Sequence, residues 1–184
     1  MALQSNARVN TETRPVGVGD RSWVRRVVSE AFASPRIVSR GVLHVADDLP
    51  GFLGEEAGEP AGLLLYHMGA GECEVVVLLS LQERKNVATT LLAEAEQAAR
   101  GAGCRRLWLV TTNDNLPAIA FHSKRGWRQV GIHRGAVAAA RRLKPEIPEF
   151  GPNGVPKEDE IEFELAIGGP APDLGIKPTA CGCG

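Results

Sequence analysis

A chain of 184 residues, 43% of them hydrophobic and 23% charged, has the size and composition of one globular domain with a sizeable core. The 21 basic and 22 acidic side chains give a formal net charge of −1, so no broad field favours nucleic acid or an anionic membrane. The polar N-terminus lacks the apolar stretch of a secretory signal, and no apolar run approaches the roughly 20 residues that span a bilayer. We therefore expect a cytoplasmic protein without a nucleic-acid or membrane partner.

The four cysteines do not form a disulfide framework or a zinc pattern. Cys73 and Cys104 lie in apolar runs, and Cys181 and Cys183 lie in a Gly-rich tail with no second pair at zinc-site spacing. No metal site is expected. The composition divides the chain into a polar leader (residues 1–12), a folded body (13–167) and a flexible tail (168–184) that has too little apolar content to fold alone.

In the first part of the body, hydrophobic periodicity predicts strands around one helix. Apolar residues at spacings of three and four predict the helix, which Asp20 or Ser22 can cap and which Ser34-Pro35 ends. Alternating runs bounded by turn residues predict the strands. We expect a strand at 14–18, the helix, a single strand at 37–46, and a hairpin of strands at 52–55 and 61–68.

The second part of the body begins with a β-branched run at 72–79, which is typical of a central strand. A helical pattern at 86–100 and a buried strand at 105–112 complete a β-α-β unit, so the two strands should be near-parallel neighbours. Further on we expect a short helix capped within Asn113–Asn115 and ended by Gly126, a strand at 127–132, a helix at 136–143 and a strand at 160–165. The prediction is an α/β chain with a mixed, mostly antiparallel sheet of six or seven strands flanked by helices.

The junction between the central strand and its helix is the first candidate binding segment, where residues 82–92 read QERKNVATTLL. A helix N-terminus presents unpaired N–H groups and the positive end of the helix dipole, so it suits a pyrophosphate. Arg84, Lys85, Thr89 and Thr90 add donors. The alternative is a solvated basic turn before an ordinary helix.

The second segment, residues 115–127, reads NLPAIAFHSKRGW. It resembles the motif N-x-x-A-x-x-F-Y-x-x-x-G-F of the GCN5-related N-acetyltransferases (GNAT family), and the earlier junction resembles the same family's acyl-CoA motif, Q/R-x-x-G-x-G/A. The resemblance extends over about residues 13 to 165. It implies the acyl-CoA N-acyltransferase fold, with a splayed central strand pair, and acetyl-CoA as co-substrate.

By this resemblance, the backbone around the helix N-terminus would cradle the pyrophosphate of the cofactor, while the strand at 72 would splay from the strand at 107 to admit the pantetheine arm. Backbone groups of about Leu78 to Leu81 would pair with the pantetheine amides, and one N–H would polarise the thioester carbonyl. Asn115 would help to hold the arm. The predicted cofactor-binding residues are Leu79, Leu81, Arg84, Lys85, Asn86, Val87, Ala88, Thr89 and Asn115.

Acyl transfer to an amine needs a neutral nitrogen, and a free alkyl amine has a pKa of about 10, so a carboxylate is a useful proton acceptor. Glu72 and Glu74 start the central strand and, two residues apart, point to one face, with Glu74 deeper in the run. The alternative for both is a cross-strand or rim charge. His122 stands where the family has a Tyr and would protonate the leaving thiolate; the alternative is a surface or core histidine.

The resemblance predicts an N-acetyltransferase that moves an acetyl, or similar short acyl, group from acetyl-CoA to a primary amine by direct attack in a ternary complex. The acceptor would be a small molecule or a peptide, and His44, Asp47 and Asp48 would lie in the region that shapes its site. Asn86 and His122 depart from the family pattern, so a non-catalytic binding or sensor domain stays open. A third reading is an interaction module that captures a partner through residues 168–184. Residues 134–157 could form a homodimer interface, cover the acceptor cleft or simply connect two strands.

Overall fold

The computed structural model of the chain describes residues 11–82 and 86–168. Its elements follow one another as β1 (Glu12–Pro15), η1 (Val18–Asp20), α1 (Arg21–Phe32), β2 (Arg36–Ser39), β3 (Val42–Val45), η2 (Ala46–Asp48), β4 (Gly51–Glu56), β5 (Glu59–Gly69), β6 (Glu72–Ser80), α2 (Val87–Gly101), β7 (Arg106–Thr112), α3 (Leu116–Lys124), β8 (Arg128–His133), α4 (Ala136–Leu143) and β9 (Glu160–Ala166). Arg84 and Lys85, Cys181 and Cys183, and nearly all of the predicted leader and tail lie outside the described residues.

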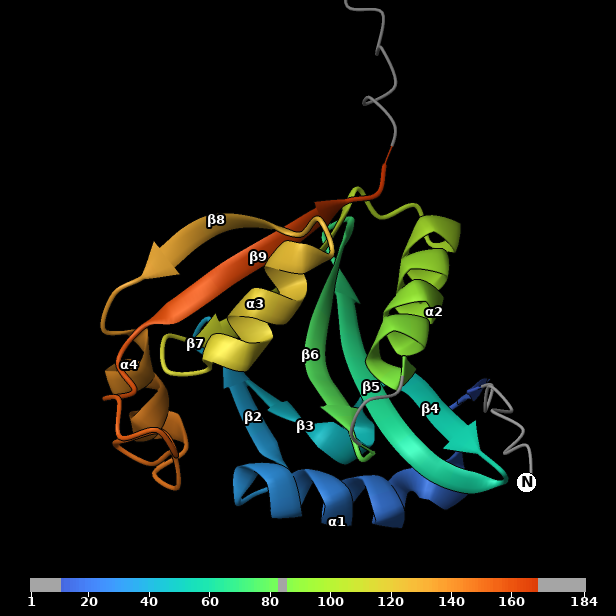
Figure 1. The fold of residues 1–184 in the computed structure, drawn as a ribbon, viewed down its shortest axis with the longest axis horizontal. Helices are drawn as coiled ribbons and strands as arrows, with labels where there is room; N and C mark the ends of the chain where they lie inside the picture. Colours follow the sequence, from blue (N-terminus) through green and yellow to red (C-terminus); the bar gives the residue numbers. More distant parts are fainter. Residues whose placement is uncertain (1–10, 83–85, 169–184) are drawn as a thin grey trace, which may run out of the picture.

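Seven strands form one sheet in the order β1-β4-β5-β6-β7-β9-β8. Each neighbouring pair is antiparallel except β6 and β7, which run parallel as the ends of the β6-α2-β7 crossover. Helices cover both faces, with α2 and α3 on the face nearer the viewer in Figure 1. The predicted mixed, mostly antiparallel sheet with one parallel pair is confirmed.

Each face of the sheet carries its own hydrophobic core. On one face, Leu91 and Ala95 of α2 pack with Cys73, Leu107 and Phe163 from the central strands. On the other face, the apolar stripe of α1 covers the strands β4 to β6, with Val24, Val28, Leu53, Leu63, Leu65 and Val77 as its buried members. The amphipathic patterns seen in the sequence therefore face the sheet from opposite sides.

The parallel strands β6 and β7 stay paired for only a short distance. Their register covers Glu72 to Glu74 against Arg106 to Trp108, whereas β6 remains paired with β5 up to Ser80. A bulge in the β5–β6 pairing between Leu65 and Tyr66 bends the strand just beyond the last β7 partner. The sheet is therefore open between β6 and β7 toward their C-terminal ends, as the family resemblance implies.

The strand predicted at residues 37–46 is wrong in one respect, because the structure forms a separate hairpin, β2–β3, over this segment. Arg40 and Gly41 both have positive φ angles, 49° and 76°, as in the tight two-residue turns that match strand twist. Gly41 was the turn signal in this stretch, and the strand-forming residues on both sides of it led to the prediction of a single strand. No helix among the described residues is long and apolar enough to cross a membrane.

Candidate functional site

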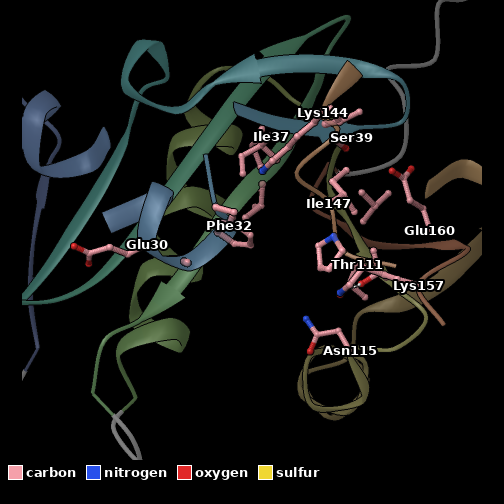
Figure 2. Close-up of a pocket in the computed structure, with 18 residues that line it drawn as sticks. Glu30, Phe32, Ile37, Ser39, Thr111, Asn115, Lys144, Ile147, Lys157 and Glu160 are labelled. Atoms are coloured by element: carbon pink, nitrogen blue, oxygen red, sulfur yellow. Dashed lines mark hydrogen bonds between the residues drawn. The ribbon is translucent and has the colours of Figure 1, made fainter. Parts of the chain in front are cut away.

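A cavity of about 450 Å³ lies on the α1 face of the sheet, where β6 and β7 part. This volume is in the range of small-molecule sites, about 300–1,000 Å³. Figure 2 shows the side chains converging on it from α1, β2, β7, β9 and the segment after α4. The lining is largely apolar, formed by Ala31, Phe32, Ala33, Ile37, Val38, Val75, Val76, Val110, Ile147 and Pro148, with Glu30, Ser39, Thr111, Thr112, Asn115, Lys144, Lys157 and Glu160 as its polar members.

One wall of the cavity is the irregular segment between α4 and β9, which contributes Lys144, Ile147, Pro148 and Lys157. The Arg141 guanidinium holds this segment by donating hydrogen bonds to three of its backbone carbonyls, those of Ile147, Pro148 and Lys157. The Asn113 side chain binds it at a second place, through Pro156, Glu158 and Asp159. Of the three roles left open for residues 134–157, the geometry favours covering the cleft.

The buried acidic group that lines the cavity is Glu160, at the start of β9, which is only 3% exposed. One of its oxygens, Oε2, accepts a hydrogen bond of 3.1 Å from the backbone N–H of Arg40 in the β2–β3 turn. Burial raises the pKa of the Glu160 carboxyl, and the nearby negative charge of Glu74 raises it further. A carboxylate of raised pKa is a better proton acceptor near neutral pH than an ordinary one.

Glu74, the deeper of the two carboxylates predicted as the base, is buried beside the cavity rather than among its lining residues. Its Oε2 lies 3.5 Å from Nε2 of His44, on β3. Neither His44 Nε2 nor Glu74 Oε1 has a hydrogen-bond partner among the described residues. The structure thus brings Glu74, His44 and Glu160 together from three strands, and Glu74 influences the cavity through the charge it places near Glu160.

Glu72, the other predicted base, has a different environment. It accepts a hydrogen bond of 2.9 Å from Arg106, and the same guanidinium binds Glu162 and Glu164 of β9. Glu72 is thus held by the guanidinium of Arg106 and does not line the cavity. This is the cross-strand arrangement that the sequence left open as the alternative for Glu72.

His122, the predicted acid, faces the sheet from α3. Its ring contacts Trp127 at 5.4 Å and Phe163 at 6.0 Å between centroids, and Nδ1 has no hydrogen-bond partner within the described part of the chain. Burial, with a contribution from Arg125, lowers the pKa of His122 to about 4. The imidazole is therefore neutral at neutral pH, and this environment is typical of a core histidine.

On the other side of the opening, α2 begins with Val87, Ala88 and Thr89. The first backbone bond of the helix runs from Thr90 N–H to Asn86 carbonyl, and no side chain caps it, so the N–H groups of residues 87–89 face outward. The helix lies close to the sheet at Gly62. A side chain at this position would clash, since a Cβ would lie only 2.4 Å from Val87 Cγ1. Outward N–H groups held at the strand opening fit an anionic cofactor group.

Arg125 adds a positive charge at this helix N-terminus. Its guanidinium donates to Thr89 Oγ1 at 2.9 Å and lies 3.6 Å from the centroid of the Phe121 ring. Of the other predicted cofactor residues, Leu79 continues the β6 pairing opposite Leu63, and Leu81 donates its N–H to Ala61 carbonyl. We define the α2 site as Asn86, Val87, Ala88, Thr89 and Arg125.

Asn115 lies at the end of the cavity nearest α3. Its side-chain Oδ1 accepts a hydrogen bond of 3.3 Å from Ala118 N–H, so it caps α3 as expected. It also lines the cavity, and the predicted role of holding a cofactor arm stays a prediction. Cys73 and Cys104 are both buried, and burial raises the pKa of the Cys73 thiol to about 12, which keeps that thiol unreactive.

A mixed sheet that opens between two parallel strands, with a helix N-terminus on one side and a cavity on the other, defines the acyl-CoA N-acyltransferase class of fold. A sequence model of the Acetyltransferase (GNAT) family matches residues 22–127. The chain belongs to this family, whose co-substrate is acetyl-CoA. It is 44% identical to the Bacillus subtilis protein YdhI and 37% identical to YxbD from the same organism, each over 71% of this chain, which corresponds to 81% and 82% of those proteins.

Solved structures show the same fold at low sequence identity. The ribosomal-protein-S18-alanine N-acetyltransferase of Escherichia coli superposes with a TM-score of 0.63 at 17% identity, covering 90% of this chain and 99% of that one. A GNAT family acetyltransferase from Elizabethkingia anophelis, solved with acetyl-CoA bound, gives a TM-score of 0.64 at 13% identity, covering 85% and 98%. These likenesses concern the fold.

Three features of the site escaped sequence reasoning: the positions of Glu160, Lys144 and Arg125. Glu160 opens an alternating strand that reads as half-exposed, and Lys144 ends an ordinary amphipathic helix. Arg125 precedes the terminal glycine of α3 and looks like a solvated residue. The available signal for Glu160 was the acidic alternation EIEFEL itself, since a strand with acids on one face needs partners for them.

Proposed function

We propose that this protein is an N-acetyltransferase that transfers an acetyl group from acetyl-CoA to a primary amine held in the cavity, by direct attack in a ternary complex. The observation that carries the proposal is the position of Glu160. A buried carboxyl of raised pKa faces a cavity that opens where β6 and β7 part. The volume of the cavity is in the range of small-molecule sites and favours a small-molecule acceptor over a folded protein surface.

The residues of the cavity would act mainly on the acceptor. An alkyl ammonium with a pKa of about 10 must lose a proton before it can attack, and Glu160, the buried carboxylate of the lining, would receive it. Glu74 contributes by holding negative charge nearby, which raises the proton affinity of Glu160. The largely apolar walls favour an acceptor with an apolar body.

The α2 site would hold the donor. The N–H groups of residues 87–89 and the Arg125 guanidinium present positive charge to a pyrophosphate. Acetyl-CoA, when bound, supplies an activated acetyl group whose bond to sulfur is replaced by a bond to the amine nitrogen, with the free thiol as the second product. Holding amine and thioester together contributes much of the rate, since proximity removes an entropic barrier.

The test is calorimetric titration of the purified protein with acetyl-CoA, with desulfo-CoA as a control, followed by an assay of CoA release over a panel of primary amines. We expect saturable binding of acetyl-CoA and amine-dependent release of CoA with formation of an N-acetyl product. Binding without turnover of any amine would point instead to the sensor domain. No binding at millimolar acetyl-CoA would reject the proposed function.

A further inference from the structure

Two lysines line the cavity, and their environments differ. Lys157 pairs with Asp114, at 2.7 Å between Nζ and Oδ2. Lys144 is more deeply buried, only 4% exposed, and its ammonium has no hydrogen bond and no carboxylate within 4.0 Å among the described residues. Burial lowers the pKa of Lys144, the negative charge of Glu146 opposes this shift, and the positive charge of Arg36 adds to it.

An unpaired ammonium in an apolar wall is unfavourable unless something pairs with it. Figure 2 shows the Lys144 side chain extending over the cavity in the direction of Ile37, and its Nζ lies 5.9 Å from the centroid of the Phe32 ring. Ser39, another lining residue, is 3% exposed, and its hydroxyl Oγ has no hydrogen-bond partner within the described residues. The positively charged Lys144 and the Ser39 hydroxyl, which lacks a hydrogen-bond partner among the described residues, therefore line the same cavity.

Glu160 enters the cavity from another element, β9, and carries the opposite charge. The lining of the cavity thus includes one buried acidic group and one buried basic group, together with the apolar side chains of Phe32, Ile37, Val76 and Val110. Such a lining matches a ligand with two charged ends and an apolar body. An amine without an anionic group would leave Lys144 unpaired.

Resting on the proposed function, we propose that the acceptor is a small amphoteric amine with an apolar body and a carboxylate, and that Lys144, assisted by the Ser39 hydroxyl, binds this carboxylate while the amine meets Glu160. The chemical class is that of an apolar amino acid. Lys144 acts in binding and takes no part in the bond changes. The reaction itself is unaltered: a nitrogen–carbon bond replaces the thioester bond, and the ammonium proton passes to Glu160.

The activity test compares matched acceptors that differ only in the anionic group: L-phenylalanine and L-leucine against their amides and against phenethylamine and isoamylamine. Hydrogen bonds to a charged partner predict a preference in kcat/KM for the carboxylate of roughly ten- to a hundred-fold. Lys144→Met should abolish this preference through a higher KM at similar kcat, and Lys144→Arg should restore part of it. Arg142→Met, which removes an exposed positive charge two residues away, should leave the preference intact.

A binding measurement separates this inference from the proposed function. 3-Phenylpropionate, an apolar carboxylate without an amine, should bind the wild-type protein and Arg142→Met, and should bind Lys144→Met at least ten-fold more weakly. Equal binding by the wild type and Lys144→Met, or no binding to either, would overturn the carboxylate site even if amines are acetylated. Acetylation of Lys144 itself, detected by peptide mapping after incubation with acetyl-CoA, would also overturn it. Failure of the wild type to bind acetyl-CoA, with Lys144-dependent binding of 3-phenylpropionate intact, would reject the proposed function alone.

Discussion

The α2 site and the cavity lie on opposite sides of the β6–β7 opening, and they are assembled in different ways. The α2 site draws most of its groups from one strand-to-helix junction, with Arg125 added from α3. The cavity combines α1, the β2–β3 hairpin, β6, β7, β9 and the segment after α4. A site at one strand-to-helix junction can be predicted from residues that are neighbours in the sequence. A cavity formed by distant segments depends on how the sheet brings those segments together.

This difference also separates what the two sites do. The backbone groups at a helix N-terminus bind an anion with little dependence on side chains. The cavity presents specific side chains, and variable segments commonly decide the acceptor on a shared scaffold. Substitutions in the cavity should therefore change amine kinetics and leave acetyl-CoA affinity alone, and substitutions in the α2 site should do the reverse.

The largest expected effect comes from Glu160→Gln. Removing a general base costs about a hundred-fold or more in rate, so we expect kcat/KM for the amine to fall by about this factor while the Kd of acetyl-CoA, measured by calorimetry, stays the same. Glu158→Gln changes an exposed acid on the same segment and serves as the control. Glu74→Gln should lower kcat/KM less, and it should shift the acidic limb of the pH–rate profile to lower pH, because the charge of Glu74 raises the pKa of Glu160. A normal rate in Glu160→Gln would remove this residue from the mechanism and return the role to Glu74.

The pH dependence of stability distinguishes the two roles considered for His122, a core histidine and a general acid. The pKa of His122 is about 4 in the folded chain against an ordinary 6.5, so the unfolded chain binds the proton first as the pH falls from 6.5 to 4. The free energy of unfolding should therefore drop over this window by about 3 kcal/mol from this group.

In His122→Phe this acid-dependent loss should disappear, as measured by urea unfolding at a series of pH values. The turnover number at neutral pH should change little if the residue only packs. A strong loss of turnover with unchanged pH-dependent stability would instead support the general-acid role predicted from the sequence.

Arg125→Met tests the α2 site. Loss of a charge-assisted contact to a phosphate should weaken acetyl-CoA binding about ten-fold, with the KM of the amine unchanged. Lys124→Met removes an exposed charge at the adjacent position and should leave the affinity as it is. Equal effects of the two substitutions would show that only the general charge of α3 matters.

Arg141→Met gives the smallest expected effect. In contrast to Arg125→Met, it should change the KM of the amine and leave acetyl-CoA binding unchanged. Without the three hydrogen bonds from Arg141, the segment that covers the cavity gains conformational freedom, which we expect to raise the KM of the amine by about five-fold. Acetyl-CoA affinity should be unaffected, and Arg142→Met is the matched control. A change in acetyl-CoA affinity alone would contradict the division into two independently formed sites.

The sequence by itself determined the order of elements and the class of fold. The β-branched run of β6, the helical period of α2 and the motif ending at Gly126 and Trp127 are local patterns, and local patterns report secondary structure because side-chain spacing follows backbone geometry. The same locality led to the one-strand prediction for residues 37–46, where the two-residue turn at Arg40 and Gly41 divides a run of strand-forming residues into two short strands.

Only the tertiary structure decided which charged groups face the cavity. Glu74 was a reasonable candidate from its place on the central strand, yet Glu160, 86 positions later in the chain, is the buried carboxylate that lines the cavity. Lys144 and Lys157 are alike in the sequence, and only the fold pairs Lys157 with Asp114 and leaves Lys144 without an ion pair among the residues that the structure describes. Burial and pairing arise when distant segments meet, and no spacing along the chain encodes them.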